Sequence, residues 1–391
     1  MRHVALIYDA RSVYDLKVMN GVAAYLQEGA DWRVYIEENA LKDQRLPDLR
    51  SWKGDGIVAN FDDPRVAGIV MQSRLPVVAF GSGYGWYKSA TRVPYFFTNN
   101  QAIARLAADH LLDRGFARFA YCGYPRTPTN GWAEERERAF AACLKARHLP
   151  CWTYRGRHKT SREWDSLQAS LRAWLEALPK PVGLMAANDN RARQVLEACR
   201  GAGLRVPEEV AVIGVDNDEM LCQLSSPLLS SIEQGARRMG YQAAALLDRI
   251  MSGAPIRRRR FVIDPVGVVT RLSTDILAVE DPAVARAMAF IWEFACTGIK
   301  VRKVIDAVGL SRSGLDARFK AAVGRTMAAQ IRRVRLERAQ RLVAGTNLSL
   351  KQIAAQSGFR SLQHMTTLFG RTFGRPPADY RKAMAAGHSL G

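Results

Sequence analysis

Short apolar runs alternate with longer amphipathic stretches from residue 1 to about residue 275. The apolar runs have the length of strands, which we predict at Val4–Tyr8, Trp32–Ile36, Gly56–Asn60, Val77–Phe80, Tyr95–Thr98, Phe119–Gly123, Gly183–Ala187, Val210–Val215 and Leu228–Ile232. The stretches between them have helical periodicity, which predicts helices at Asp15–Glu28, Pro64–Ser73, Asn100–Arg114, Glu134–Arg147, Glu163–Ala177, Arg191–Ala202 and Ala236–Ser252. Regular alternation of strand and helix indicates parallel sheets covered on both faces, and the length favours two such α/β lobes.

The last hundred residues carry a different pattern, in which a short helix, a turn and a second helix occur twice. Gly309 and Gly358 fall where the chain must turn sharply with positive φ, which strains any other residue. Ser311 and Ser361 follow at positions that cap the second helix of each pair. A basic helix from Met327 to Ala344 is predicted to join the pairs. One such pair occurs in many helical bundles, whereas two in tandem are typical of a DNA-binding domain.

The second helix of each pair has two distinct faces. Its apolar stripe, at four-residue spacing, consists of Leu315 and Phe319 in the first pair and of Met365, Phe369 and Phe373 in the second. The opposite faces carry short polar and basic side chains, which are the groups that read base edges in the major groove of double-stranded DNA. The candidate DNA-binding residues are Arg312, Ser313, Asp316, Lys320, Arg360, Gln363, His364, Thr366 and Thr367.

The positive charge of the chain is concentrated on the segment with the helix pairs. The whole chain has a formal net charge of +20, and residues 280–391 hold 19 Lys and Arg against 7 Asp and Glu. Solvated surface charge is the ordinary explanation of such an excess. On a segment with two helix pairs it also suits phosphate contact, in which each neutralised phosphate releases condensed counterions.

Cysteine usage and hydropathy exclude several classes of protein. The six cysteines form no C-x-x-C pair, and no His/Cys cluster has the spacing of zinc ligands. Several lie in apolar runs, so we expect buried reduced thiols and a cytoplasmic location. The first apolar run is too short for a signal peptide, and no stretch has the length of a membrane span. We therefore expect no metal site, no cofactor and no membrane association.

Almost every predicted strand is followed by Asp or Asn, as at Asp9, Asn99, Asn188, Asp189 and Asp216. Open parallel sheets bind ligands beyond the carboxyl ends of their strands, and these side chains can bond hydroxyl groups. The same residue types favour turns and helix caps, and we expect capping to account for about half of them.

The C-terminal segment resembles the arabinose-operon-regulator family of transcription activators. The matching residues include Ile353-Ala354, Gly358-Phe359, Ser361, Phe369, Gly374, Pro377 and Tyr380-Arg381. The N-terminal segment resembles the periplasmic-binding-protein-like sensor of lactose-repressor-type regulators. This second likeness rests on Gly54-Asp-Gly-Ile-Val58, the Ala187-Asn188-Asp189 turn and Val206-Pro207 through Asp216.

Four further segments carry a wider likeness: Gln234–Ala244, Asp281–Val284, Gly298–Val301 and Asp306–Ser313. On these segments the two modules, in this order, resemble the family of bacterial xylose operon activators over nearly the whole chain. That resemblance implies a D-xylose or related monosaccharide effector, double-stranded operator DNA and RNA polymerase as partners, and a homodimer. It places Arg136 at a position that bonds sugar hydroxyls and Asn99 where an Asp is common. Trp132 is close to Arg136 in sequence and is therefore a candidate to stack on the sugar ring, although we favour a packing role for it. The expected ligand-binding residues are Asp9, Tyr14, Asp15, Asn99, Arg136, Asn188, Asp189 and Asp216.

Helical signals resume at Asp281-Pro282, a helix cap followed by a first-turn proline. We therefore expect a two-lobed periplasmic-binding-protein-like sensor over 1–275 and an all-α domain with two helix-turn-helix motifs over 276–391. An enzyme is the first alternative, but the chain has no phosphate-loop or nucleophile-elbow motif. A transport receptor would not carry the helix pairs. A sugar-released repressor stays open beside a sugar-dependent activator.

Overall fold

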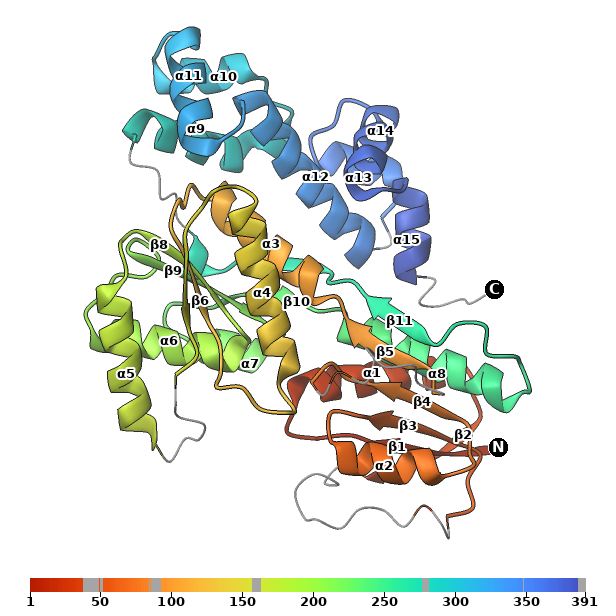
Figure 1. Ribbon diagram of the computed structural model, residues 1–391. Helices are drawn as coiled ribbons and strands as arrows, with labels where there is room; N and C mark the ends of the chain where they lie inside the picture. Colours follow the sequence, from red (N-terminus) through yellow and green to blue (C-terminus); the bar gives the residue numbers. More distant parts are fainter. Residues whose placement is uncertain are drawn as a thin grey trace.

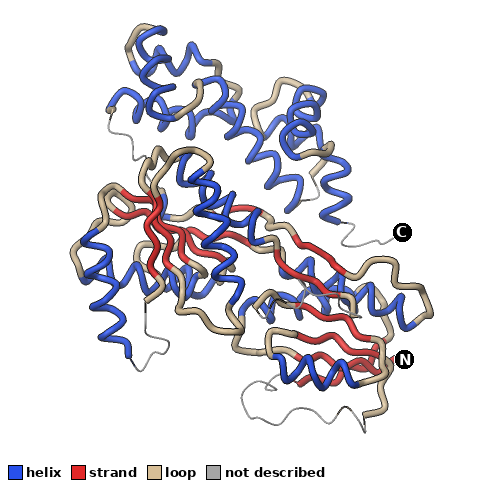
Figure 2. Tube along the Cα trace, viewed as in Figure 1, coloured by secondary structure: helices blue, strands red, loops and turns tan. Residues whose placement is uncertain are grey.

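A computed structural model describes residues 1–37, 49, 52–83, 85, 93–156, 163–275, 281–346 and 348–385. Two α/β lobes precede an all-helical domain (Figure 1). Helices cover both faces of each sheet, as Figure 2 shows. The predicted fold class is therefore confirmed. The predicted division at 275 and 276 falls at the edge of residues 276–280, which lie outside the described part of the chain.

Lobe 1 is built on a sheet of six strands, in which every recorded pairing is parallel. In sheet order the strands are β11 (Arg260–Ile263), β5 (Tyr95–Thr98), β4 (Val77–Phe80), β3 (Gly56–Asn60), β1 (Arg2–Ile7) and β2 (Trp32–Glu37). Its helices are α1 (Val13–Gln27), α2 (Pro64–Gln72) and α8 (Ala236–Met251). Helices α1 and α8 cross in close contact, because a Cβ added to Gly240 would lie 1.7 Å from the carbonyl oxygen of Val18. This contact fixes α1, whose first turn faces lobe 2.

Lobe 2 repeats the design with one antiparallel edge. In sheet order its strands are β12 (Gly267–Val269), β10 (Ser230–Glu233), β9 (Val210–Val215), β8 (Val182–Ala186), β6 (Phe119–Cys122) and β7 (Cys151–Tyr154). Its helices are α3 (Asn100–Asp113), α4 (Gly131–Lys145), α5 (Trp164–Ala177), α6 (Asp189–Gly201) and α7 (Glu219–Leu224). The sequence did not predict β7, α7 or the antiparallel pairing of β12 with β10.

The chain passes between the lobes three times, after β5, after β10 and after β11. Backbone bonds hold these crossings side by side: Asn99 N–H donates to the Ile263 carbonyl at 2.9 Å, and Val266 N–H donates to the Glu233 carbonyl at 2.8 Å. We call these three adjacent crossings the hinge, because connections of this kind are where two lobes rotate relative to each other.

The helical domain contains α9 (Pro282–Phe294), α10 (Val301–Val308), α11 (Arg312–Val323), α12 (Met327–Gly345), α13 (Leu350–Gln356), α14 (Leu362–Phe373) and α15 (Pro377–Ala385). Both predicted helix pairs are present, as α10–α11 and α13–α14, and α12 joins them (Figure 1). Gly309 and Gly358 have φ of 74° and 71°, and Ser311 and Ser361 cap α11 and α14 as predicted. Each half of α12 contributes to a separate apolar core, so the domain consists of two packed units on one helix.

Candidate functional site

A cavity of about 210 Å³ lies between the lobes. Its lining is mainly polar and comes from both lobes: Asp9, Ser12, Tyr14, Asp15, Asn60, Asp62, Ser82, Thr98, Trp132, Arg136, Asn188, Asp216 and Gln234. Six of the eight expected ligand-binding residues are among them, namely Asp9, Tyr14, Asp15, Arg136, Asn188 and Asp216. The structure therefore brings these six together at one place, beyond the ends of the strands.

On the lobe 1 side, Asp15 and Tyr14 lie in the first turn of α1. Asp15 is almost fully buried, and its carboxylate accepts bonds from Asn60 Nδ2 at 2.7 Å and from the Asp9 N–H at 2.9 Å. Burial raises the pKa of Asp15 to about 7, because a charge is poorly solvated there. Burial also raises the pKa of Tyr14 well above its usual range, so its hydroxyl stays protonated and can donate or accept.

On the lobe 2 side, the guanidinium of Arg136 is buried and held in a fixed orientation. It donates to Asn100 Oδ1 at 3.0 Å, to the Ala187 carbonyl at 2.6 Å and to Gln234 Oε1 at 2.7 Å. It also lies 4.8 Å from the centre of the Trp132 ring. Trp132 packs against Arg136, and its side chain also lines the cavity.

Asp216 follows β9 and enters the cavity from an unusual backbone conformation. Its φ is 116°, and that of Asn217 is 49°, a region that non-glycine residues rarely adopt. The Gln234 side-chain amide donates to the Asp216 carboxylate. Burial raises the pKa of Asp216 to about 6, and the nearby charge of Arg136 partly offsets that rise. Backbone strain at a ligand-facing residue is typical of a binding site that fixes one geometry.

Two expected residues do not line the cavity, and the structure corrects their placement. Asn99 caps α3 by accepting from the Ala102 N–H at 3.0 Å, and its amide donates to Asp264 at 2.7 Å within the hinge. Asp189 is buried beneath the site, where it accepts from Ser231 Oγ at 2.6 Å and from the Asp218 N–H at 2.7 Å. Asn99 is thus an example of the capping use of such residues, and Asp189 supports the turn that carries Asp216.

The expected set also missed several lining residues. Asp62 and Ser82 follow β3 and β4, so their position after strands was a usable signal. Ser12 is the cap of α1, and Gln234 lies in a hinge crossing. Sequence offers no signal to separate such residues from ordinary caps and linkers. Asn60 and Thr98 are the last residues of their strands and were assigned to the strands themselves.

The cavity suits a small, uncharged, polyhydroxylated ligand. Carboxylates, amides and hydroxyls surround it, and these groups can both accept from and donate to sugar hydroxyls. Four carboxyl groups, of Asp9, Asp15, Asp62 and Asp216, and one arginine line the cavity, so its charge does not favour an anionic ligand. Over the described residues, no group of three or more His, Cys, Asp or Glu is placed to hold a metal ion.

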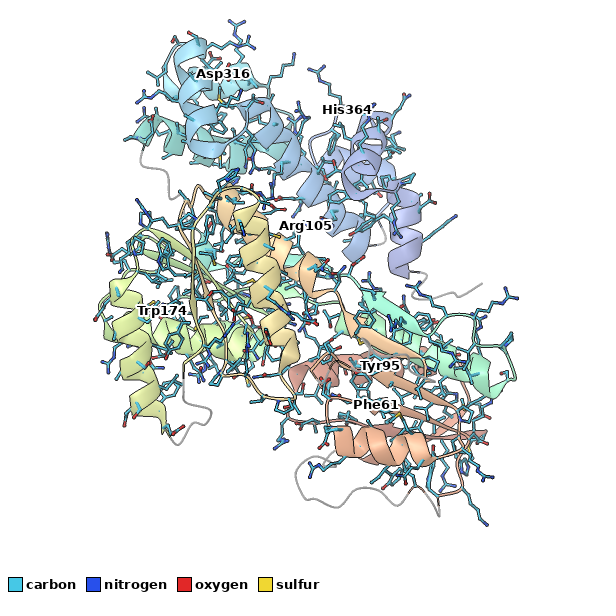
Figure 3. All side chains as sticks on the ribbon, viewed as in Figure 1. Phe61, Tyr95, Arg105, Trp174, Asp316 and His364 are labelled. Atoms are coloured by element: carbon cyan, nitrogen blue, oxygen red, sulfur yellow. The ribbon has the colours of Figure 1, made fainter. Side chains whose placement is uncertain are left out.

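The nine candidate DNA-binding residues all lie on α11 and α14 or immediately before α14, away from the apolar cores. Seven are exposed, and Asp316 and Thr366 are half-buried. Arg312 and Asp316 form an ion pair at 3.7 Å. Figure 3 shows Asp316 and His364 on the side of the helical domain that is turned away from the sensor. Leu315, Phe319, Met365 and Phe369 are fully buried on the opposite sides of these helices. Helices of this kind, with a polar exposed face and an anchored apolar face, can enter a major groove.

None of the helices in the described ranges has the length and apolar character needed to cross a bilayer.

Three family models match the chain. They are described as the XylR N-terminal domain over residues 3–101, a periplasmic binding protein-like domain over 108–274 and a helix-turn-helix domain over 304–383. The chain is 39% identical to the xylose operon regulatory protein of Escherichia coli strain K12 over 382 residues, which is 97% of each protein. It is 34% identical to the protein of the same name from Haemophilus influenzae, again over 97% of each. A solved structure described as the xylose-binding transcription activator XylR matches with a TM-score of 0.64 and 38% identity, and 98% of each chain is covered.

Proposed function

The chain belongs to the family of xylose operon regulatory proteins, which are transcription regulators, and from this premise we propose that D-xylose binds between its lobes and controls its binding to operator DNA. The observation that carries the proposal is the convergence of Asp15, Arg136 and Asp216 on one polar cavity. We propose Asp9, Tyr14 and Asn188 as further ligand-binding residues. Trp132 and Gln234 are added to them because they also line the cavity.

The nine residues on the exposed faces of α11 and α14 contact the operator. The two helix pairs enter successive major grooves on one face of the duplex, with half-sites about 10 bp apart. Arg312, Lys320 and Arg360 are exposed cations on these faces, which suits contact with phosphates or guanine edges.

Sugar binding closes the lobes and raises operator affinity, and the bound protein then recruits RNA polymerase as an activator. The protein acts as a homodimer and in the cytoplasm, where operator DNA is found. The sensor (lobes 1 and 2) and the DNA-binding domain, called the reader below, are separate modules. A rigid-body shift at the hinge can therefore transmit sugar binding from the sensor to the reader. Coupling of this kind is typically about 1–3 kcal/mol and must be reciprocal, so operator DNA tightens xylose binding by the same factor.

Thermal unfolding of the full-length protein with a panel of pentoses and hexoses tests the sugar. A ligand at 100 times its Kd adds about 2.7 kcal/mol to stability, and D-xylose is expected to give the largest shift. Asp216→Ala should reduce the shift, because donors that face the carboxylate would lose their acceptor. Asp31→Ala, at a carboxylate on the surface, is the matched control. If no neutral sugar stabilises the wild-type protein, the proposal is wrong.

Operator binding with and without xylose tests the switch. Equal operator affinity in both conditions would place the action of the sugar after DNA binding, at the polymerase. A lower affinity with xylose would make the protein a sugar-released repressor instead.

A further inference from the structure

The ammonium of Lys17 reaches from lobe 1 to the turn of lobe 2 that presents Asp216. Lys17 Nζ donates to the Asp216 carbonyl at 2.7 Å, to the Asn217 carbonyl at 3.1 Å and to Glu233 Oε2 at 2.5 Å. A lysine has three N–H donors, so the three acceptors match its full capacity. Lys17 lies on α1, and all three acceptors belong to lobe 2 or to its edge at the hinge.

The two carbonyls belong to a strained piece of backbone. Asp216 and Asn217 have φ of 116° and 49°, and residues in such conformations persist only where their surroundings fix them. Three hydrogen bonds to Asn217 come from lobe 2 itself. Its N–H donates to Ser231 Oγ at 2.9 Å, Arg271 donates to its side chain at 2.8 Å, and its side-chain amide donates to Glu233 Oε2 at 3.4 Å. Lys17 adds a hydrogen bond from lobe 1, which it donates to the carbonyl of Asp216, the residue that faces the cavity.

Lys17 lies on the same helix as two residues that line the cavity. Tyr14 and Asp15, one turn earlier on the same helix, line the cavity, while Lys17 does not. The close crossing of α1 and α8 holds α1 as part of lobe 1. Tyr14, Asp15 and Lys17 are therefore held by the same helix, and in this structure that helix contacts the Asp216 turn through Lys17.

We propose that Lys17 is a positioning residue for sugar recognition, which sets the direction of the Asp216 carboxylate from the opposite lobe. This inference rests on the proposed sugar-binding function. Lys17 acts through Asp216 rather than by touching the ligand. Glu233 balances its charge in an ion pair whose side chains are 22% and 23% exposed, so the contact is partly shielded from water.

Calorimetry and stopped-flow binding of D-xylose to the full-length protein test the proposal with Lys17→Met. The expected result is a Kd raised about tenfold or more, the effect of losing charge-assisted hydrogen bonds, with most of the change in faster dissociation. Lys17→Arg keeps the charge and the donors and should recover part of the affinity. Arg205→Met removes a cation from an exposed ion pair with Glu209 in lobe 2 and should leave the affinity unchanged.

A double-mutant cycle with Asp216→Ala separates positioning from a general loss of structure. If Lys17 acts through Asp216, then Lys17→Met has little further effect once Asp216 is gone, and the two losses are not additive. Additive losses, or a wild-type Kd in Lys17→Met, would overturn the inference while the proposed function stands. Should Lys17→Met fail to fold, Glu233→Gln gives the same comparison, because it replaces the ion pair with Lys17 by at most a neutral hydrogen bond and should weaken binding by a smaller factor. A wild-type protein that binds no sugar would instead mark the failure of the proposed function.

Discussion

Asp113, the last residue of α3, lies 2.5 Å from a guanidinium nitrogen of Arg333 in α12. Its other carboxylate oxygen accepts from Arg325 Nη1, also at 2.5 Å. Asn100, at the other end of α3, accepts from Arg136 of the cavity at 3.0 Å. A helix of 14 residues is about 21 Å long, so α3 connects the cavity between the lobes, the proposed sugar site, to the DNA-binding domain as one stiff element (Figure 1).

The first prediction is that Asp113→Asn uncouples sugar binding from DNA binding. The carboxylate is buried and pairs with two arginines of the DNA-binding domain. Asp113→Asn removes the charge that holds both arginines to α3, and leaves Arg333 with Glu337 and Arg325 with Gln330, both within the DNA-binding domain. Removing one partner of such a buried pair costs about 3–5 kcal/mol at most, and the exposure of both arginines lowers that figure. We expect the ratio of operator Kd values without and with xylose to fall toward one, as measured by fluorescence anisotropy.

Xylose affinity in the absence of DNA should change little in Asp113→Asn, because the residue lies at the far end of α3 from the cavity. Glu209→Gln, at a carboxylate paired on the surface of lobe 2, is the control for loss of one negative charge. An undiminished response to xylose in Asp113→Asn would mean that the signal reaches the reader by another route.

The second prediction concerns pH and Asp15. Burial raises the pKa of Asp15 from its ordinary 3.8 to about 7, so between these values the folded protein holds a proton that the unfolded chain has lost. This contribution to stability is complete below about pH 4 and is lost as the pH rises through about 7. The side chain introduced by Asp15→Asn cannot ionise. In this variant the free energy of unfolding should therefore fall less steeply as the pH rises, by up to about 1.4 kcal/mol per pH unit.

Urea unfolding of the full-length protein at several pH values between these limits measures this slope. Groups such as Asp216, whose pKa burial raises to about 6, titrate in both proteins and cancel in the difference. Asp31→Asn, at an exposed carboxylate, should keep the wild-type slope. The same slope in wild type and Asp15→Asn would show that Asp15 is ionised in the folded state at all these pH values.

The periodicity of the chain was sufficient to predict most of the fold. The bounds of β3, β4, β5 and β9 match the predicted strands, because central parallel strands are continuous apolar runs. Strand β7 was missed because Cys151–Tyr154 is a half-exposed edge strand with a weak apolar signal.

The site could be predicted only in part, because residues that look alike in sequence point in different directions. Asp189 and Asp216 both follow strands of lobe 2, yet Asp189 turns beneath the site and Asp216 turns into it. The role of Lys17 had no sequence signal, since its partners are 199 to 216 residues away. The same holds for Asp113, whose partners depend on how the reader docks on the sensor.

The third prediction is that Gln363→Ala lowers affinity for the operator but not for unrelated DNA. Gln363 is exposed in the first turn of α14, where a side chain of a recognition helix reaches base edges. Loss of one base contact typically costs about 1–3 kcal/mol. Competition binding with operator and random duplexes measures the ratio, and Gln356→Ala, an exposed glutamine on α13, is the matched control. Equal losses on both duplexes would indicate a contact with the phosphates instead.

The last prediction compares the two turn glycines, Gly309 and Gly358. Both have φ near 70°, so alanine at either position costs about 1–2 kcal/mol in backbone strain. A Cβ at Gly309 meets open space, whereas one at Gly358 would lie 2.7 Å from the carbonyl carbon and oxygen of Cys296. Arg335 donates to the neighbouring Ala295 carbonyl at 2.7 Å. The segment that contains Cys296 therefore cannot move away freely.

Gly358→Ala must therefore push the second helix pair away from the turn at Ala295–Thr297 that leads into the first pair, which adds about 1–3 kcal/mol of overpacking to the strain. Calorimetric unfolding of the full-length protein should show a larger loss for Gly358→Ala than for Gly309→Ala. Operator affinity at low temperature, where both variants are folded, should fall for Gly358→Ala because its two recognition helices no longer match successive grooves. It should stay near wild type for Gly309→Ala, where nothing has to move. Equal effects of the two substitutions would mean that the contact between Gly358 and Cys296 does not set the spacing of the helix pairs.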